Sequence, residues 1–464
     1  MKNISVKATS EKSVIKKLKK IFLSASFTRV VAAGYLIFAV IGTVLLMLPF
    51  SSKTGEWTSF ADALTTATSA SCVTGLIVFD TFTHWSLFGQ IVILCLMQVG
   101  GLGYMIFITM FSLLIDRKIG LRERNLLKES TNSLDMGGLS GLVKKAVAGT
   151  FMFETAGAVL LSFRFCSMFG IKKGIYYGVF HSVSSFCNAG FDLMGVLEPY
   201  SSMTGFSSDP FVLITLSLLI IIGGLGFVVW ADICKNKFNF KKYSLHSKIV
   251  LATSAILLFA GALLTFAFEY DNTLADMSLA DKAVNSFFTS VSVRTAGGNS
   301  IDIAAMTPAS YLWHIVFMLI GGSPGSTAGG LKTTTFAVVL LTAWATVRNS
   351  RNVNVFGRKL DSEVIRKALT VVMIYVTFLF VSTLTICATN PGFALPEVLF
   401  ETASAIGTVG LSVGVTGNVN TAGQMILTLL MFCGRVGSMS FAMVFAQRKT
   451  ESSVLYPTEK IIVG

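Results

Sequence analysis

The chain has 464 residues, of which 53% are hydrophobic and only 13% charged, and its mean hydropathy is +0.71. A water-soluble core cannot bury that much apolar side chain, so the composition excludes a soluble fold and indicates an integral membrane protein. The formal net charge of +13 would suit a nucleic-acid ligand, but the placement of the basic residues argues against one.

Most basic residues gather in five segments between the apolar runs. Residues 1–29, 116–145, 234–248, 348–367 and 447–464 carry eight, seven, five, six and three Lys or Arg residues, which is 29 of the 37 in the chain. Short basic loops stay on the cytoplasmic side of a membrane. We therefore expect both termini and the three internal connectors to be cytoplasmic, in a multi-pass protein that contacts membrane lipid and no nucleic acid.

Between consecutive basic segments the same order of elements occurs four times. A long apolar segment is followed by a short Ser- and Thr-rich segment that ends in Gly, and then by a second long apolar segment. We expect first helices near residues 30–50, 146–169, 249–269 and 365–389, and second helices near 87–115, 211–233, 311–346 and 422–446. The predicted fold is all-α and integral to the membrane, with four tandem units of helix, pore helix with loop, and helix around one pseudo-fourfold pore.

The domain boundaries follow from this pattern. Four repeats are expected at residues 30–115, 146–233, 249–347 and 365–446. Cytoplasmic connectors would occupy residues 116–145, 234–248 and 348–364, with a basic cytoplasmic N-terminus at 1–29 and a cytoplasmic tail at 447–464.

The short segments end at four glycines, Gly75, Gly190, Gly297 and Gly410, which recur every 107 to 115 residues. The segments are too short to cross a bilayer and too polar to face lipid, which predicts re-entrant pore helices. Non-helical backbone at membrane depth must line a cavity, where rings of carbonyls can replace the water around a cation. The alternative is that these glycines only let membrane helices pack closely; four copies at one period favour the filter. The serines of the third copy are shifted by one residue.

The second apolar segment of the third unit is interrupted at residues 321–335 by Pro324 and five glycines. Leu331 separates Gly330 from Lys332, so the segment is not a phosphate-binding Walker A loop. Interrupted membrane helices tend to line a cavity, and we interpret this one as a gate below the filter; a packed structural kink is the alternative. The predicted gate residues are Gly321, Gly322, Ser323, Pro324, Gly325, Ser326, Thr327, Ala328, Gly329, Gly330, Lys332 and Arg435.

Several charged residues lie in or beside apolar segments. Arg435 would be costly near the bilayer centre unless it faces the aqueous pathway or is paired. Lys332 is a second pore charge or an interfacial one, and Arg294 is expected to brace the third loop by hydrogen bonding. Acids near the glycines (Asp192, Glu198 and Glu401) either attract cations or form local pairs. Glycine clusters at 100–103, 223–226 and 434–437 predict close helix contacts.

The residues at 73–76 (VTGL), 188–191 (NAGF), 294–297 (RTAG) and 407–412 (GTVGLS) resemble, in order, the Trk/Ktr/HKT superfamily of cation transporters, and most closely the KtrB-type membrane subunits of bacterial Ktr systems. The resemblance implies potassium uptake, because all four filter positions carry Gly whereas sodium-selective plant relatives have Ser at the first. Gly298 stands where the family usually has Phe. The ion-binding residues implied are Val73, Thr74, Gly75, Asn188, Ala189, Gly190, Thr295, Ala296, Gly297, Thr408, Val409 and Gly410.

The same resemblance implies the setting of the protein. It would be a homodimer in the bacterial cell membrane, docked on a cytosolic ring of nucleotide-binding RCK subunits like KtrA. Potassium would be the transported ion and sodium an activating or coupled ion, as in a symporter, with no nucleotide on this chain. The intramembrane loop would obstruct the pathway, with Arg435 just under the filter.

A different function remains open, that of a secondary transporter for another cation or a small organic solute. The repeats of such transporters are often inverted, whereas every unit here starts and ends on the basic side. An enzyme is not expected, because no paired carboxylates, His-metal cluster or activated nucleophile stands at catalytic spacing.

Overall fold

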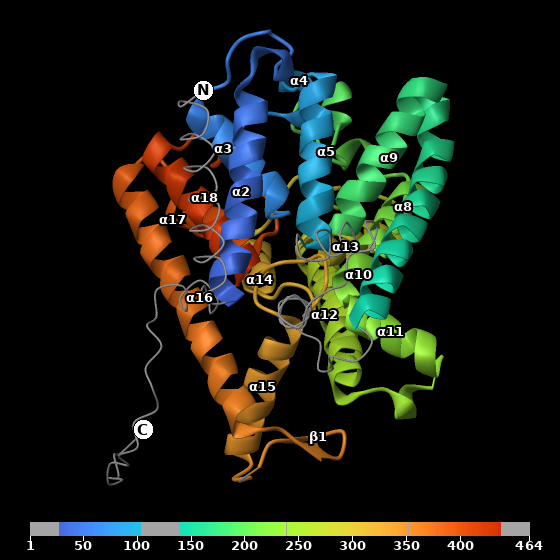
Figure 1. The fold of residues 1–464 in the computed structure, drawn as a ribbon, viewed down its shortest axis with the longest axis vertical. Coiled ribbons are helices and arrows are strands. Elements are labelled where there is room, and N and C mark those ends of the chain that lie inside the picture. Colours follow the sequence, from blue (N-terminus) through green and yellow to red (C-terminus); the bar gives the residue numbers. More distant parts are fainter. Residues whose placement is uncertain (1–26, 104–138, 238, 351, 438–464) are drawn as a thin grey trace, which may run out of the picture.

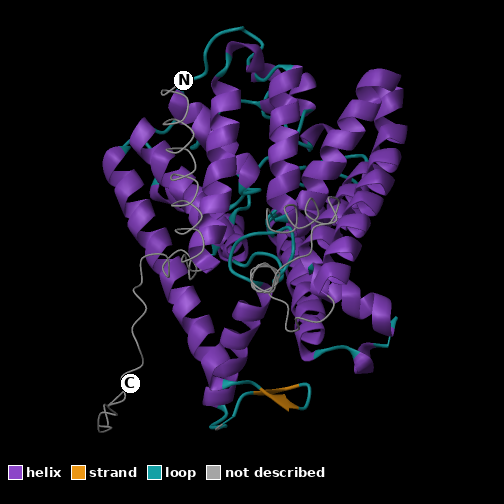
Figure 2. Cartoon of the chain, in the orientation of Figure 1, coloured by secondary structure: helices purple, strands orange, loops and turns teal. Residues whose placement is uncertain are grey.

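The computed structural model describes residues 27–103, 139–237, 239–350 and 352–437 (Figure 1). Most of the basic N-terminus, most of connector 116–145, the inner ends of the first and fourth units and the whole tail lie outside the described residues. The secondary structure of the described residues is helical, as Figure 2 shows, except for one small hairpin, and loops join the helices.

The first helix of each unit is a continuous span. These helices are α2 (Phe27–Met47), α8 (Leu139–Phe169), α12 (Leu245–Glu269) and α16 (Ser362–Thr389). Among the described residues all four are long and apolar enough to cross a membrane. Polar residues set the N-termini of two of them, because Ser244 and Asp361 accept a first-turn N–H. The predicted positions are confirmed within a few residues at most ends.

The second helices of units one, two and four were predicted to be continuous, and this prediction is wrong, whereas the interruption expected in the third unit is confirmed. The structure has α5 (Leu87–Leu102), α10 (Pro210–Leu225), α14 (Pro308–Leu319) and α18 (Thr421–Val436). Gly103, Gly226 and Gly437 follow three of them with φ of 80°, 94° and 89°, a conformation that suits Gly and ends a helix. The chain then bends by 93° from α10 into α11 (Phe227–Asn236). In the third unit a loop separates α14 from α15 (Thr333–Val347).

The short polar segments form helices whose C-terminal parts are buried in the protein. They are α3 (Phe60–Ser71), α9 (Ile171–Cys187), α13 (Leu279–Ser292) and α17 (Leu395–Gly407). Ser59 and Ser278 cap two of them by accepting the N–H of Asp62 and Asp281. Residues 65–71 of α3 are all buried despite five Ser or Thr side chains, so these helices face protein, as predicted.

The four units form a closed ring. The second helix of each unit packs on the short helix of the next, with α5 on α9, α10 on α13, α14 on α17 and α18 back on α3. At this last contact Thr65 Oγ1 lies 2.9 Å from Thr428 Oγ1, and Gln424 Nε2 donates to Asp62 Oδ1 at 2.8 Å. The predicted arrangement of four tandem units is therefore confirmed.

The small elements mark the two ends of the ring. The hairpin strands β1 (Asn354–Val355) and β2 (Arg358–Lys359) pair antiparallel, in a connector for which no strand was predicted. In Figure 1 this hairpin and α11 lie at the end opposite α4 (Thr81–His84). The two described basic connectors thus share one end. Short 3₁₀ turns occupy Pro49–Ser51, Met194–Val196, Thr204–Phe206 and Phe240–Lys242.

Candidate functional site

Each short helix leads into a three-residue segment with unusual backbone geometry. The first and third residues have positive φ, and the middle residue does not. Positive φ at a β-branched residue costs roughly 1–3 kcal/mol, so the surrounding structure imposes this conformation. The alternation turns successive peptide units over and allows their carbonyls to face one axis. The first residues have φ of 58° (Val73), 58° (Asn188), 79° (Thr295) and 51° (Thr408), and the glycines 90° (Gly75), 73° (Gly190), 67° (Gly297) and 97° (Gly410).

The four segments meet at one axis. A Cβ atom added to Gly75 would stand 2.6 Å from Ala189 O, and one added to Gly190 would stand 3.0 Å from Ala296 O. The next contact, from Gly297, is 2.6 Å to Val409 O, and Gly410 returns to Thr74 O. Each glycine therefore adjoins the carbonyl that precedes the next glycine. The structure brings together all twelve residues predicted to bind the ion, and we name their three-residue segments the filter segments.

Serine side chains hold the filter segments from behind. Ser69 Oγ accepts the N–H of Gly75 and Ser404 Oγ that of Gly410, both at 3.0 Å. Ser184 of the second unit instead donates to Phe191 O at 2.6 Å. In the third unit the equivalent donor to Gly298 O is Ser292, one position later in its helix, so the predicted shift of the third copy is confirmed. Main-chain oxygens are the ligands that this geometry offers to a cation.

Among the described residues, the one nine positions before each filter glycine supports the loop beyond the glycine in units two and four only. In unit two it is His181, whose Nδ1 lies 2.7 Å from Tyr177 O and whose Nε2 accepts the N–H of Leu193 at 3.2 Å. In unit four it is Glu401, which accepts hydrogen bonds from the loop that follows Gly410. Units one and three have Thr66 and Phe288 there, and the Thr66 hydroxyl has no partner within the described chain. Sequence reasoning missed this support, although the spacing from the glycine was visible.

Glu401 is fully buried and does not attract cations from outside. Its carboxylate accepts the Ser412 hydroxyl at 2.7 Å, the Thr416 N–H at 2.9 Å and the Val413 N–H at 3.4 Å, as well as the Thr416 hydroxyl. The alternative of local pairing is therefore the correct one for this residue, and Glu401 is a positioning residue for the fourth filter segment.

Replacing Glu401 with Leu is expected to loosen the outer part of the fourth segment. Each donor left unpaired in the interior costs about 1–3 kcal/mol, so we expect both a lower melting temperature and weaker potassium-over-sodium selection. Glu363→Leu is the matched control, because Glu363 makes an exposed pair with Lys367 worth about 0.5 kcal/mol or less. Thermal unfolding and ion-replacement flux measure the two effects. Unchanged selection in a folded Glu401→Leu protein would contradict the positioning role.

Asp192 lies in the loop beyond the second filter segment, outside the membrane-spanning helices. Burial raises the pKa of its carboxyl to about 7, and the nearby Asp80 acts in the same direction. The group is thus neutral below pH 7 and negative above it. We expect the KM of the wild-type protein for potassium to fall by up to about fivefold from pH 6 to pH 8, because a carboxylate close to a cation in water contributes about 1 kcal/mol. In the Asp192→Asn variant the KM for potassium should no longer change between pH 6 and pH 8. If the change persists, a group other than Asp192 causes the pH dependence.

The loop at residues 320–332 leaves helical geometry, as predicted, but it is shorter than the predicted 321–335 because α15 already begins at Thr333. Its ends lie side by side, because Gly321 N donates to Leu331 O at 2.8 Å. Three backbone bonds tie it to unit two, from Ser323 N to Gly224 O at 3.0 Å, from Thr327 N to Gly223 O at 3.3 Å and from Phe227 N to Gly325 O at 2.9 Å. We call these residues the intramembrane loop.

The intramembrane loop also contacts two filter segments. Thr327 Oγ1 donates to Phe186 O at 3.1 Å and lies 3.5 Å from the amide of Asn188. A Cβ on Gly329 would collide with the Thr408 hydroxyl. Asn188 and Thr408 are the first residues of their segments, so the loop crosses the inner end of the ring.

Arg435 joins three parts of the chain at this crossing. Its guanidinium donates to Thr327 O in the intramembrane loop and to Gly100 O, to Gly101 O at 3.2 Å, and to the Tyr35 hydroxyl at 3.2 Å. Gly100 O also accepts the N–H of Gly103 at 3.2 Å, and the guanidinium adds further donors for the carbonyls in the last turn of α5. This cation therefore helps to cap α5 while it holds the loop. The partners of Arg435 in the described structure are main-chain oxygens and the Tyr35 hydroxyl and not a carboxylate; its pore role stays a prediction.

The other two predicted cations behave differently. Lys332 Nζ donates to Ala328 O at 2.8 Å and so closes the intramembrane loop on itself. Arg294 does not brace the third loop as predicted. The one hydrogen bond that its side chain makes in the described structure is a long one, 3.5 Å to Ser254 Oγ.

The predicted close helix contacts at the glycine clusters are confirmed. A Cβ on Gly100 would collide with Ser71 O, one on Gly223 with Phe186 O, and one on Gly434 with Ile406 O. Each of these carbonyls belongs to the short helix of the same unit, four residues before its filter glycine. The second helices thus approach the filter with no side chain between the backbones.

Comparisons with known proteins agree with this architecture. The sequence profile of the TrkH family, described as cation transport protein, matches residues 1–455. The chain is 40% identical to Ktr system potassium uptake protein B of Bacillus subtilis, over 94% of this chain and 96% of that protein. It is 38% identical to the potassium/sodium uptake protein NtpJ of Enterococcus hirae, over 96% of this chain and 99% of that protein.

A solved structure shares the fold. The potassium transporter TrkH from Vibrio parahaemolyticus superposes with a TM-score of 0.68 and covers 89% of this chain and 85% of its own. The two sequences are 19% identical, so this likeness concerns the arrangement of helices and not the choice of ion.

Proposed function

Because this chain belongs to the TrkH family of cation transport proteins, which are transporters and not enzymes, we propose that it takes up potassium through its four filter segments. The closed ring of Gly75, Gly190, Gly297 and Gly410 carries the proposal, since rings of main-chain oxygens are what a dehydrated potassium ion requires. Relatives named as potassium uptake proteins over nearly the whole chain support it.

In this proposal the twelve residues of the filter segments bind the ion, and the intramembrane loop is the gate. The loop contacts Asn188 and Thr408 at the inner end of the ring, and Arg435 holds it to α5. Release of these contacts would open the pathway toward the cytoplasmic connectors. The proposal also includes the four tandem units, with both termini on the cytoplasmic side.

We also propose a multi-subunit setting in the bacterial cell membrane. The Bacillus subtilis relative is named as part of a Ktr system, which supports partner subunits for this chain. The resemblance of the filter sequences to the Ktr type adds to this proposal a homodimer docked on a cytosolic RCK ring like KtrA. The Enterococcus hirae relative is named a potassium/sodium uptake protein, which supports sodium as an activating or coupled ion in a symporter. Nucleotide would then bind the ring and not this chain.

The test of the function uses the purified protein in potassium-loaded vesicles. Rubidium uptake that potassium competes away is expected, with no uptake from a panel of organic solutes. A secondary transporter for an organic solute, the alternative function, would show the reverse. Such a result would overturn the proposal while leaving the fold unchanged.

Gly75→Ser tests where selection occurs. Gly75 has φ of 90° and a Cβ there would stand 2.6 Å from Ala189 O, so the variant must distort the ring. We expect discrimination against sodium to fall at least about tenfold, equivalent to ~1.4 kcal/mol, in ion-replacement flux. Gly392→Ser is the control, because a Cβ at Gly392 meets no atom within 4 Å. Equal selection in both variants would place the filter elsewhere.

A further inference from the structure

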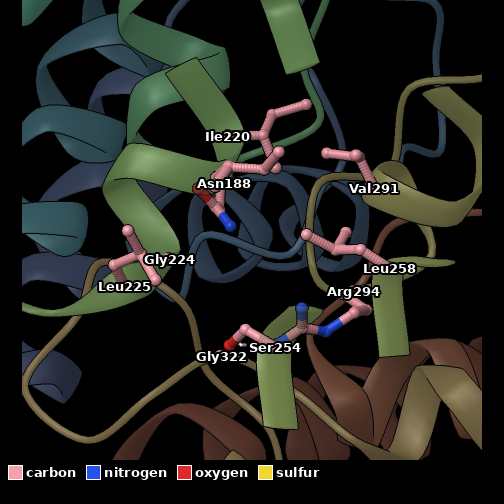
Figure 3. Close-up of a pocket in the computed structure, with 10 residues that line it drawn as sticks. Asn188, Ile220, Gly224, Leu225, Ser254, Leu258, Val291, Arg294 and Gly322 are labelled. Carbon is pink, nitrogen blue, oxygen red and sulfur yellow. Dashed lines mark hydrogen bonds between the residues drawn. The ribbon is translucent and has the colours of Figure 1, made fainter. Parts of the chain in front are cut away.

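A small cavity lies behind the third filter segment, where α10, α12, α13 and the intramembrane loop meet (Figure 3). The cavity volume is about 20 Å³, which is enough for one water or one small ion. The cavity is lined by Asn188, Ile220, Ile221, Gly224, Leu225, Ser254, Leu258, Val291, Arg294 and Gly322.

The polar feature of this cavity is the guanidinium of Arg294. The residue is only 9% exposed, and Figure 3 shows its side chain extending toward Ser254 and Gly322. A guanidinium has five N–H donors, yet among the described residues Nε has no partner and the one side-chain hydrogen bond is the 3.5 Å contact with Ser254 Oγ. Within the described ranges Arg294 forms no ion pair; the two pairs there join Arg164 to Asp209 and Lys367 to Glu363.

Such a charge requires compensation. Removing an unpaired ion from water costs several kcal/mol, and Ile220, Leu258 and Val291 give the cavity apolar walls. The Ser254 hydroxyl faces the guanidinium, and the Gly322 N–H has no acceptor in the described part of the chain. The Asn188 amide also lines the cavity, but Thr295 Oγ1 and Thr327 Oγ1 lie within hydrogen-bond distance of it. A ligand that only accepts hydrogen bonds and carries negative charge matches these groups better than water, which must also donate.

We propose that this cavity binds one small monovalent anion of the halide class, held by Arg294, the hydroxyl of Ser254 and the N–H of Gly322. Arg294 immediately precedes Thr295 of the third filter segment, and Gly322 belongs to the intramembrane loop. The anion would therefore connect the filter to the loop from behind, off the cation axis. The site stands on these contacts alone and does not depend on which cation the protein carries.

Bromide is the probe for this site. Crystals of the full chain grown in potassium bromide are expected to show one anomalous peak between Arg294, Ser254 and Gly322. In solution, bromide replacing gluconate at constant potassium should raise the thermal unfolding midpoint in a saturable way. Arg294→Gln should abolish the peak and raise the half-saturating bromide concentration at least about tenfold.

Arg164→Gln is the matched control, since Arg164 is a half-exposed arginine paired with Asp209; its bromide response should equal the wild type. If Arg294→Gln does not fold, Ser254→Val provides the same comparison with the charge retained and one donor removed. Electron density of a water without anomalous signal, together with a midpoint that ignores bromide, would overturn the proposal. A bromide response that survives in folded Arg294→Gln would overturn it as well.

Discussion

Potassium uptake is expected to fall at least about a hundredfold, equivalent to ~2.7 kcal/mol, when Gly297 is replaced by Ala. The same replacement at the adjacent Gly298 should leave uptake near the wild-type rate. Gly297 has φ of 67°, and a Cβ there would stand 2.6 Å from Val409 O and 3.0 Å from the Cα of Gly410. Those are main-chain atoms of the next filter segment, so the neighbour cannot move aside without opening the ring.

Gly298 makes this comparison sharp. It has no positive φ, and the one atom near an added Cβ is Phe288 Cζ, at the ordinary distance of 3.5 Å. Rubidium uptake into vesicles at matched protein amounts measures both variants. Similar loss in the two would mean that substitution near the third segment damages folding in general, and similar retention would remove Gly297 from the filter.

Deletion of residues 325–330 is expected to raise rubidium flux by about tenfold or more, which corresponds to removing a barrier of at least ~1.4 kcal/mol. The deletion removes Thr327, whose carbonyl binds Arg435, and Gly329, which packs on Thr408. The paired ends of the loop, Ile320 and Leu331, remain. Because the filter segments are untouched, selection of potassium over sodium should persist.

Two arginine variants calibrate the deletion. Arg435→Ala removes the attachment of the intramembrane loop to α5 and should raise flux to an intermediate level. Arg164→Ala, at a half-exposed ion pair, should leave flux unchanged. With a nucleotide-binding partner ring present, flux through the deletion variant should no longer respond to nucleotide. A deletion variant with wild-type, nucleotide-responsive flux would reduce the loop to a packed kink.

The sequence predicted those features that depend on composition over a whole segment. The first helices were placed correctly because about 20 apolar residues are needed to cross a bilayer wherever they occur. The burial of residues 64–75 in protein was predicted because a segment so rich in Ser and Thr is too polar to face lipid. Gly75, Gly190, Gly297 and Gly410 were found because a backbone requirement repeated at one period leaves the same residue each time.

Features imposed by packing were not predictable. Val73, Thr295 and Thr408 take positive φ although β-branched residues avoid it; the ring imposes this conformation and no local signal announces it. Gly103, Gly226 and Gly437 end helices inside apolar runs, where sequence alone cannot distinguish a helix end from a close-packing glycine. Arg294 was expected to find a partner because buried cations usually do, and its surroundings became visible only when α12 and the intramembrane loop were placed beside it.

The contact between α18 and α3 has a consequence for biogenesis. Thr65 and Thr428, which meet there, are 363 positions apart, so the chain must be almost fully synthesised before the circle can shut. Until then the early part of the polypeptide keeps the polar flank of α3 in the bilayer without its final neighbour, a state in which incomplete chains are prone to misassembly. A chain that ends after the third unit would lack α18 and so could not form a closed pore. Its uncovered α3 would be the feature by which quality control could recognise the incomplete protein.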